Sequence, residues 1–319
     1  MLASFTLLTL GLALSVPAYT FFAQLPGAPE LGMAWHRWTL TLPDSFALCT
    51  VGAYFLMIVW NVQRSAASKA AAQKWAAKSS SGVGTILVAW NYFLCVLSLL
   101  MLVANVRSAS NIVANNGGAR VSLLCDGDSM WLHTPEKGVD MFWQLMFLWS
   151  KFAELFDTVL LVVRGRNVIF LHWYHHITVL LYCWFTTTTE SPAIIFASMN
   201  AFVHSIMYYY YARMAQGVRP AFGRILTSIQ LSQMVVGSGC AFCFIYLNSV
   251  DPEACPGSTK MAADNGLLRD RMAAATVIMY GSYMVLFLRF FITKYLTPVP
   301  QKKLDSKPTE DKIKETKRK

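Results

Sequence analysis

Four of the six histidines in the chain lie in segments that are otherwise apolar. His172, His175 and His176 form an H-x-x-H-H box in one such segment, and His204 lies in the next. On a helix, the spacing i, i+3, i+4 places the three box histidines on one face. Because ionisable side chains are costly to place in hydrocarbon, a bonding partner, a metal ion or a reaction must account for this cluster.

The segment before the box carries a lysine and two carboxylates. Lys151, Glu154 and Thr158 fall on one helical stripe, with Asp157 at its edge. Such charges inside an apolar segment must pair with one another or face a polar cavity. A purely structural ion pair between Lys151 and Glu154 is the alternative to a role in chemistry.

Two later segments continue the pattern. Asn200, His204 and Tyr208 share one helical face, and Gln230 and Gln233 lie in the segment that follows. A tyrosine stripe alone is typical of packing near a membrane interface, and single amides often only bridge helices. Counted from the basic ends of the segments at about 1.5 Å per residue, however, the box histidines, His204, Asp157 and Gln230 fall at similar depths, about 6–13 Å. The spacing therefore predicts one polar layer that four helices share.

The composition predicts an all-α, polytopic membrane protein as the scaffold for this layer. The chain has 319 residues, of which 55% are hydrophobic and 14% charged, and its mean hydropathy is +0.42. A membrane-spanning helix needs about 20 largely apolar residues. Seven windows meet this standard: 43–60, 84–104, 140–163, 168–186, 192–213, 225–247 and 272–293. These seven windows are therefore the expected core helices.

The remaining segments differ from these windows. The apolar stretch 2–22 lacks the basic start and clear cleavage site of a signal peptide, so an extra span, an interfacial helix and a cleaved signal all stay open. The Ala-, Ser- and Lys-rich loop 61–83 predicts a short interfacial helix or a mobile connector. We divide the chain into an apolar segment with a lumenal linker (1–38), a seven-helix membrane domain (39–296) and a disordered basic tail (297–319).

Positive charge gathers on one side of the predicted membrane domain. One set of loops, together with the tail, holds 18 Lys and Arg residues, and the opposite set holds 6. Because basic loops stay in the cytosol, this difference places the C-terminus there and the start of the first core helix on the other side. The net charge of +10 is thus loop asymmetry rather than a nucleic-acid-binding surface.

Two of the seven cysteines lie in different loops on the side opposite the basic loops. If that side is the oxidising lumen of the secretory pathway, Cys125 and Cys255 are able to form a disulfide. The alternative is two unrelated free thiols. A Cα separation beyond about 7 Å would exclude the bond.

Several kinds of chemistry fit a histidine box in a membrane. Di-metal desaturases and hydroxylases also carry such boxes, but beyond the four clustered histidines this chain supplies only His36 and His133. Metal-free acyl transfer, with imidazole as nucleophile or base, is the alternative that we favour. Cys183 is seven residues from His176, about 10 Å along a helix, which disfavours a thiolate–imidazole pair. A seven-helix receptor or transporter is the non-enzymatic reading, although neither requires this polar layer.

The four polar segments together resemble a known family. Their signatures are Lys151-x-x-Glu154-x-x-Asp157-Thr158, His172-x-x-His175-His176, Asn200-x-x-x-His204-x-x-Met207-Tyr208-x-Tyr210-Tyr211 and Thr227-x-x-Gln230-x-x-Gln233. In this order they are similar to the four boxes of the very-long-chain fatty acid elongase (ELO) family. Each box alone is a weak signal, whereas four in register over roughly residues 40–295 are specific.

This resemblance implies the condensing step of fatty acid elongation at the endoplasmic reticulum. It also implies that the seven core helices enclose a narrow acyl tunnel. In that step, acyl-CoA and malonyl-CoA give 3-oxoacyl-CoA, CoA and carbon dioxide, with no tightly bound cofactor. The implied partners are membrane lipids and a separate 3-oxoacyl-CoA reductase, 3-hydroxyacyl-CoA dehydratase and enoyl-CoA reductase; a homo-oligomer is compatible with the sequence. A basic rim suits the CoA phosphates and consists of Arg164, Arg166, Arg213, Arg219, Arg224 and Lys294.

Roles for the box residues follow from this reaction. We expect an imidazole, His175 first and His204 or His176 next, to attack the thioester and form an acyl-imidazole. In the competing route, the same histidines stabilise the enolate without a covalent intermediate. His172, Asp157 and Glu154 would orient or charge-balance the imidazoles, and Asn200, Gln230 and Gln233 would donate hydrogen bonds to oxyanions.

Two further positions bear on substrate and location. Asn167 lies five positions before the histidine box. An Asn there resembles the family type that handles saturated and monounsaturated chains, whereas a Gln is commoner at this position in types that handle polyunsaturated chains. The tail departs from the family's dilysine retrieval signal, because Lys317 stands third from the end but Thr316 and Glu315 occupy the other positions. The expected location therefore rests on the membrane boxes rather than on the tail.

Overall fold

All seven predicted core segments are helices in the computed structural model of the chain, which describes residues 2–78, 82–116, 122–125, 127, 131, 137–251, 255 and 267–297. His133 and, apart from Thr297, the predicted disordered tail lie outside the described residues. The helices are α1 (Leu2–Gln24), α2 (Ala28–Thr41), α3 (Asp44–Gln63), α4 (Ala66–Ala77), α5 (Val83–Asn115), α6 (Ser122–Cys125), α8 (Gly138–Val163), α9 (Phe170–Thr188), α10 (Ile194–Ala215), α11 (Gly223–Val250), α13 (Leu267–Phe291) and the π-helix η3 (Ile292–Leu296).

Six of these helices close into a ring. Each helix packs on the next in the order α9, α8, α5, α10, α11 and α13, and α13 packs back on α9. The first of the seven predicted spans, α3, lies outside this ring against α9. Its Tyr54 hydroxyl also reaches Thr158 of α8 at 2.8 Å. The ring of six, rather than all seven helices, encloses the pockets described below.

Four helices in the described part of the chain are long and apolar enough to cross a membrane by length and composition: α3, α5, α11 and α13 with its π-helical end. The other three predicted spans, α8, α9 and α10, have the length of a span but carry the polar layer. Lys151, Glu154 and Asp157, for example, all lie in α8. Their polar side chains explain why hydropathy alone does not single them out.

Helix α5 continues well beyond the apolar window that predicted it. The window ends at residue 104, but the helix runs to Asn115. In this extension Asn105 and Ile112 are buried, and Asn105 Oδ1 accepts a 2.8 Å hydrogen bond from Gln144 Nε2 of α8. Tertiary packing therefore stabilises a stretch whose hydropathy had fallen.

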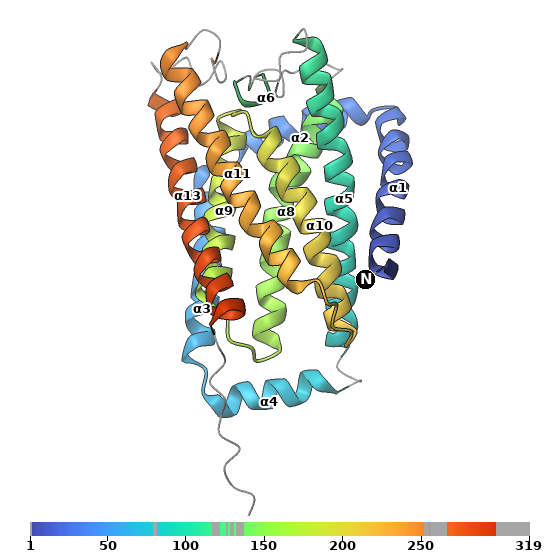
Figure 1. The fold of residues 1–319 in the computed structure, drawn as a ribbon, viewed down its shortest axis with the longest axis vertical. Coiled ribbons are helices and arrows are strands. Elements are labelled where there is room, and N and C mark those ends of the chain that lie inside the picture. The colour runs from blue at the N-terminus through green and yellow to red at the C-terminus, as the bar shows by residue number, and fades with distance from the viewer. Residues whose placement is uncertain are drawn as a thin grey trace, which may run out of the picture.

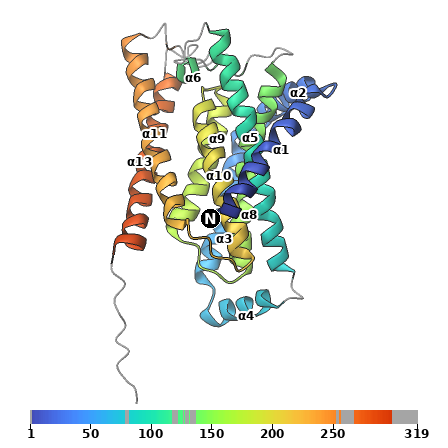
Figure 2. The same ribbon diagram turned by 45° about the vertical axis from the view of Figure 1, so that its right-hand side comes forward.

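The N-terminal helices pack on the outside of the ring. Figures 1 and 2 both show α1 beside α5, and α2 packs along α8. The contact between α2 and α8 is close because Gly32 meets the backbone of Gly138. The predicted boundary between the N-terminal segment and the membrane domain, at residue 38, falls inside a helix, because α2 extends to Thr41. Whether α1 itself spans a membrane stays a prediction.

The loop 61–83 contains the short helix α4, which lies across one end of the bundle (Figure 1). Its start is fixed by Ser65, whose side chain accepts a 3.1 Å hydrogen bond from the backbone N–H of Ser68. We call this the α4 end of the bundle. The loop is therefore helical rather than an irregular connector, and its place at a membrane interface stays a prediction.

A disulfide joins Cys125 of α6 to Cys255, whose Cα atoms lie 4.4 Å apart. The bond confirms the predicted pairing, and the alternative of two free thiols is wrong. It links α6, which precedes α8, to the segment after α11 at the end of the bundle opposite α4 (Figure 1). We call this the disulfide end.

Candidate active site

All four histidines of the polar layer line one cavity of about 860 Å³, the histidine pocket. Its walls come from α8, α9, α10, α11 and α13. Eight of the ten residues predicted for catalysis line it: Asp157, His172, His175, His176, Asn200, His204, Gln230 and Gln233. The expected convergence of four helices on one layer is therefore present.

The box histidines lie close together on α9. The ring centroids of His172 and His176 are 4.5 Å apart, and those of His175 and His176 are 5.7 Å apart. His172 Nε2 lies 2.8 Å from Thr158 Oγ1, which fixes the orientation of that ring. Within the described residues, the buried Nδ1 atoms of His175 and His176 have no hydrogen-bond partner. These two imidazoles are therefore not committed to structural hydrogen bonds through Nδ1.

Lys151 and Glu154 lie behind the pocket rather than in its wall. Lys151 Nζ is 2.7 Å from Glu154 Oε1, and both side chains are almost completely buried. The same Glu154 oxygen lies 3.6 Å from His204 Nδ1. The structural ion pair considered from the sequence is present, and it is also in contact with a pocket histidine.

Asn200 connects this charge pair to the pocket wall. Its Oδ1 accepts a 2.8 Å hydrogen bond from Lys151 Nζ. Because a lysine ammonium can only donate, this bond identifies the oxygen of the amide and leaves Nδ2 as the free donor. Asn200 is thus oriented as a hydrogen-bond donor by a buried charge.

Asp157 is held by two donors from other helices. Trp90 Nε1 of α5 donates to Oδ1 at 2.7 Å, and the Tyr208 hydroxyl of α10 donates to Oδ2 at 2.9 Å. Tyr208 belongs to the predicted polar face, but Trp90 was missed. A tryptophan in an apolar window gives no periodic signal of its own, and only the packing of α5 on α8 reveals its role.

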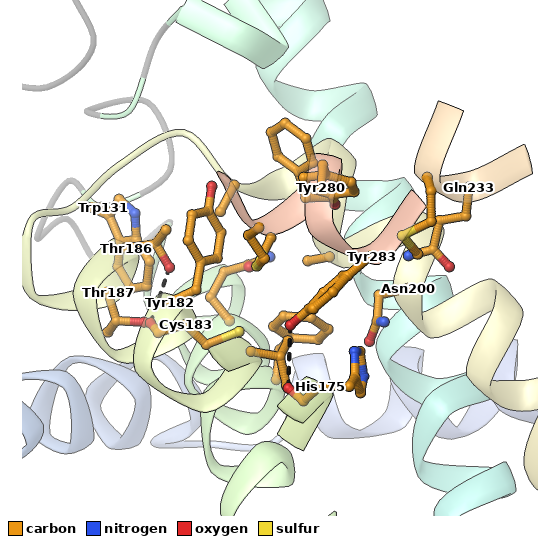
Figure 3. A pocket seen from close by; sticks show the side chains of 18 residues that line it. Trp131, His175, Tyr182, Cys183, Thr186, Thr187, Asn200, Gln233, Tyr280 and Tyr283 are labelled. Atoms are coloured by element: carbon orange, nitrogen blue, oxygen red, sulfur yellow. Dashed lines mark hydrogen bonds between the residues drawn. The ribbon is translucent and has the colours of Figure 1, made fainter. Parts of the chain in front are cut away.

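A second cavity of about 640 Å³, the inner pocket, begins where the histidine pocket ends. The two share His175, Asn200, Gln233 and Met234. In Figure 3, His175, Asn200 and Gln233 lie at one side of the inner pocket, and Trp131, Thr186 and Thr187 lie at the other. His175 is therefore the histidine that faces both cavities.

The inner pocket has a largely aromatic wall that the sequence did not reveal. Tyr182, Phe196, Tyr280 and Tyr283 all line it. The Tyr283 hydroxyl donates a 3.2 Å hydrogen bond to the backbone carbonyl of His175 (Figure 3). Tyr283 thereby fixes the turn of α9 that presents His175.

The two predicted glutamines on α11 differ in their surroundings. Gln233 is buried and lines both the histidine pocket and the inner pocket. Gln230 lines only the first of these, and its Nε2 contacts Met207 Sδ at 3.5 Å. Gln233 is therefore the amide closer to the junction at His175.

The predicted basic rim divides into two groups. Arg164 and Arg166 line a further cavity toward the α4 end, the mouth pocket, which shares Asp157, His172 and Tyr211 with the histidine pocket. Partial burial, with the nearby charge of Arg166, lowers the pKa of the Arg164 guanidinium. Since arginine stays protonated nonetheless, a partly desolvated cation faces this mouth.

The other rim residues do not line these pockets. Arg213 Nη1 donates to Gln216 Oε1 at 2.8 Å. Arg224 and Lys294 lie over aromatic rings of the α13–η3 segment, at 5.9 Å from Phe291 and 5.0 Å from Phe290. Arg219 is exposed between α10 and α11. Only the arginines between α8 and α9 are thus brought to the site.

Helix α4 holds the turn between α8 and α9 that carries these arginines. Lys69 Nζ donates to Asn167 Oδ1 at 2.9 Å, and Gln73 Nε2 donates to the carbonyl of Gly165 at 3.0 Å. Gly165 has a φ of +63° and packs against the carbonyl oxygen of Lys69. The mouth pocket is therefore shaped by α4 as well as by the turn itself.

The described residues contain no group of three or more His, Cys, Asp or Glu side chains placed to hold a metal ion. The box imidazoles instead lie beside hydroxyl and carboxylate groups. The described site thus brings imidazole, amide and carboxylate groups together around one cavity.

Comparison with known proteins gives consistent results. Residues 40–303 match the model of the GNS1/SUR4 (ELO) family. The chain is 35% identical to fatty acid elongase 2 of Trypanosoma brucei brucei (strain 927/4 GUTat10.1), over 67% of this chain and 76% of that protein. It is 36% identical to very long chain fatty acid elongase 6 of Drosophila melanogaster, over 66% and 63% of the two chains. No solved structure gives a significant match.

Proposed function

This chain belongs to the GNS1/SUR4 (ELO) family and is an enzyme of fatty acid elongation, and on that premise we propose that it catalyses the condensing step of the cycle. It joins a long-chain acyl-CoA to malonyl-CoA and gives 3-oxoacyl-CoA, carbon dioxide and free CoA. One observation carries the proposal: His175 lies where the polar histidine pocket meets the aromatic inner pocket. A thioester at this junction would have its acyl chain in one cavity and its CoA moiety toward the other.

In the proposed reaction, the His175 imidazole attacks the thioester carbonyl. A carbon–nitrogen bond forms, the carbon–sulfur bond breaks, and CoA leaves as a thiolate that takes up a proton. Malonyl-CoA then loses carbon dioxide, and its α-carbon forms a carbon–carbon bond to the acyl carbon. The carbon–nitrogen bond breaks, and the imidazole takes up a proton from solvent, which replaces the N–H proton given to the CoA thiolate. In the alternative route, the same α-carbon attacks the acyl-CoA directly, without an acyl-enzyme.

The neighbouring residues support charge development at this point. The Lys151 contact leaves Asn200 Nδ2 to donate toward an oxyanion, and Gln233 lines the same junction. Glu154, 3.6 Å from His204, favours an imidazole that is oriented and ready to hold a proton. His172 and His176 lie on either side of the same helical face and are positioned to assist.

The mouth pocket is the proposed site for the CoA end of the substrates. Arg164 and Arg166 face it, and arginine suits phosphate and carboxylate groups because it donates two parallel hydrogen bonds. On this assignment, the α4 end faces the cytosol, and the disulfide end faces an oxidising lumen such as that of the endoplasmic reticulum. The products would pass to separate reductases and a dehydratase of the cycle.

The test supplies purified protein with malonyl-CoA and acyl-CoAs of graded length and measures 3-oxoacyl-CoA by mass spectrometry. We expect His175→Ala to abolish product formation. His36→Gln is the control, because His36 is also a histidine enclosed by the fold but lies in α2, outside the pocket linings. Undiminished condensation by His175→Ala would rule out the assignment.

A second measurement separates the two chemical routes. Incubation of the wild-type protein with acyl-CoA alone should release one CoA per active site and leave an acyl adduct on a histidine peptide. If neither is detected while condensation with malonyl-CoA proceeds, the direct route replaces the covalent one.

A further inference from the structure

A third cavity lies beyond the inner pocket, separated from it by two aromatic side chains. This outer pocket is small and lies between α9, α11 and α13 near the disulfide end. Tyr182 and Phe196 line both the inner and the outer pocket. They therefore form the wall between the two cavities.

The wall is held closed by a hydrogen bond between helices. The Tyr182 hydroxyl of α9 lies 2.8 Å from Thr276 Oγ1 of α13. Thr276 is buried, and its hydroxyl donates to the carbonyl of Met272 at 2.7 Å, so the threonine is itself fixed. Phe196 is positioned by the ring of Tyr280, at a centroid distance of 5.4 Å.

The position of Tyr182 along α9 relates this wall to the proposed chemistry. Tyr182 lies seven residues after His175, on the same face of the helix and about 10 Å further toward the disulfide end. An acyl chain attached at His175 and extending along the inner pocket would meet the Tyr182 ring after this distance.

The outer pocket has the character of further space for hydrocarbon. Its lining includes Leu124, Ala241, Phe244, Met272 and Ala273. The two alanines leave room at the surfaces of α11 and α13, and among the described residues no charged side chain contributes to the lining. Such a wall favours an apolar occupant.

We propose that the Tyr182–Thr276 pair is a length gate, which ends the acyl chain within the inner pocket when closed and admits longer chains to the outer pocket when opened. Tyr182 is then a specificity-determining residue of this enzyme. The proposal rests on the proposed function, because it takes the acyl chain as the occupant of the inner pocket.

The experiment compares the wild type with Tyr182→Ala, Tyr182→Phe and Thr276→Val, using acyl-CoAs of increasing length. For the first chain length that the wild type rejects, Tyr182→Ala should raise kcat/KM about tenfold or more, because room for added methylenes strongly discriminates substrates. The other two variants keep the ring and lose the hydrogen bond between Tyr182 and Thr276, so we expect a smaller rise of about fivefold or less. The readout is the ratio of kcat/KM between long and short acyl-CoAs, which should rise because only the long chains reach the wall.

Tyr174→Phe is the matched control. It removes a 3.0 Å hydrogen bond between the same two helices, from Tyr174 to Ser282 Oγ, but Tyr174 lines none of these pockets. Its length profile should equal that of the wild type. If Tyr182→Ala folds and is active but keeps the wild-type profile, the gate is refuted. If Tyr182→Ala does not fold, the length profiles of Tyr182→Phe and Thr276→Val provide the test. A shift toward longer chains in these variants supports the gate, and wild-type profiles in both refute it.

Acyl-CoA binding separates this proposal from the proposed function. The affinity of the wild type should stop rising at the length where the chain meets Tyr182, and that length should increase in Tyr182→Ala. If the wild type forms no product with malonyl-CoA, the condensing function fails. The shift in the binding profile then still supports the gate, and an unchanged profile overturns it.

Discussion

Two sets of helices differ in composition and in role. The central set consists of α8, α9 and α10, and the apolar set consists of α3, α5, α11 and α13. The apolar set has the length and composition of membrane spans, with at most 33% of the residues in each apolar window buried. The central set carries the lysine, the carboxylates and the histidines of the site. Because hydrocarbon penalises such groups, the chemistry requires the enclosure that the apolar set helps to provide.

This difference teaches where function lies in such a fold. The helices that look least like membrane spans are those that carry the proposed chemistry. Partners from the apolar set complete it with single polar side chains, such as Trp90 of α5 against Asp157 and Tyr283 of α13 against the His175 carbonyl. Replacing a polar residue of the central set should therefore change stability or activity much more than replacing an exposed residue of the apolar set.

The largest effect is expected from breaking the buried ion pair. Lys151→Met leaves Glu154 buried without its cation, which should cost about 3–5 kcal/mol of unfolding free energy. Arg289→Met on α13 is the control, because Arg289 is exposed and its loss should change stability by about 0.5 kcal/mol or less. Denaturant unfolding in detergent measures both. Equal losses for the two variants would contradict the contrast between the sets.

Apolar truncations give the next largest difference. Leu180→Ala removes a side chain of α9 that is 0% exposed, and we expect a loss of about 2–5 kcal/mol from the cavity that it leaves. Ile278→Ala on α13 removes one that is 66% exposed, and its cost should stay near 0.5 kcal/mol. Thermal unfolding of the two variants side by side tests this. A large loss of unfolding free energy in Ile278→Ala would show that this exposed face of α13 packs against protein.

Removal of the disulfide should have an intermediate effect outside the central set. Cys125→Ser should lower the unfolding free energy by about 2–4 kcal/mol, because the bond closes a long loop. Cys49→Ser, at an exposed free thiol of α3, should be nearly neutral. A reductant should bring the wild type to the level of the variant. If the reductant has no effect, the cysteines are not paired in the protein tested.

The smallest effect should appear in substrate binding. Arg164→Ala removes one cation from the mouth pocket and should raise KM for CoA substrates about tenfold with little change in kcat. Arg219→Ala, at an exposed position outside the pocket linings, should leave KM unchanged. Steady-state kinetics with both variants checks this. The opposite ranking would move the CoA site toward the turn between α10 and α11.

Much of this arrangement could be predicted from helical periodicity. The seven core helices followed from the apolar windows, and the shared face of His172, His175 and His176 followed from their spacing. The depth estimate placed His204 and Asp157 in the same layer, where both now line the histidine pocket. These features depend on one helix at a time, which is why a single sequence contains them.

Features that depend on how helices rotate and pack were not predictable. The position of α3 outside the ring, the extension of α5 and the contact of Trp90 with Asp157 all arise from tertiary packing. Likewise, the basic rim residues looked equivalent in the sequence. Only the turn between α8 and α9 brings its arginines to a pocket, because α4 holds that turn in place.

The glycine at the centre of that turn also limits how the protein can vary. Gly165 combines a left-handed backbone with direct contact to the carbonyl of Lys69, so neither its conformation nor its space admits a side chain. Gly217, between α10 and α11, has a φ of +82° but open space around it. In a library of all single substitutions, position 165 should accept only glycine, whereas position 217 should also tolerate asparagine. Two turns with similar backbones thus differ in their freedom to diverge among related chains.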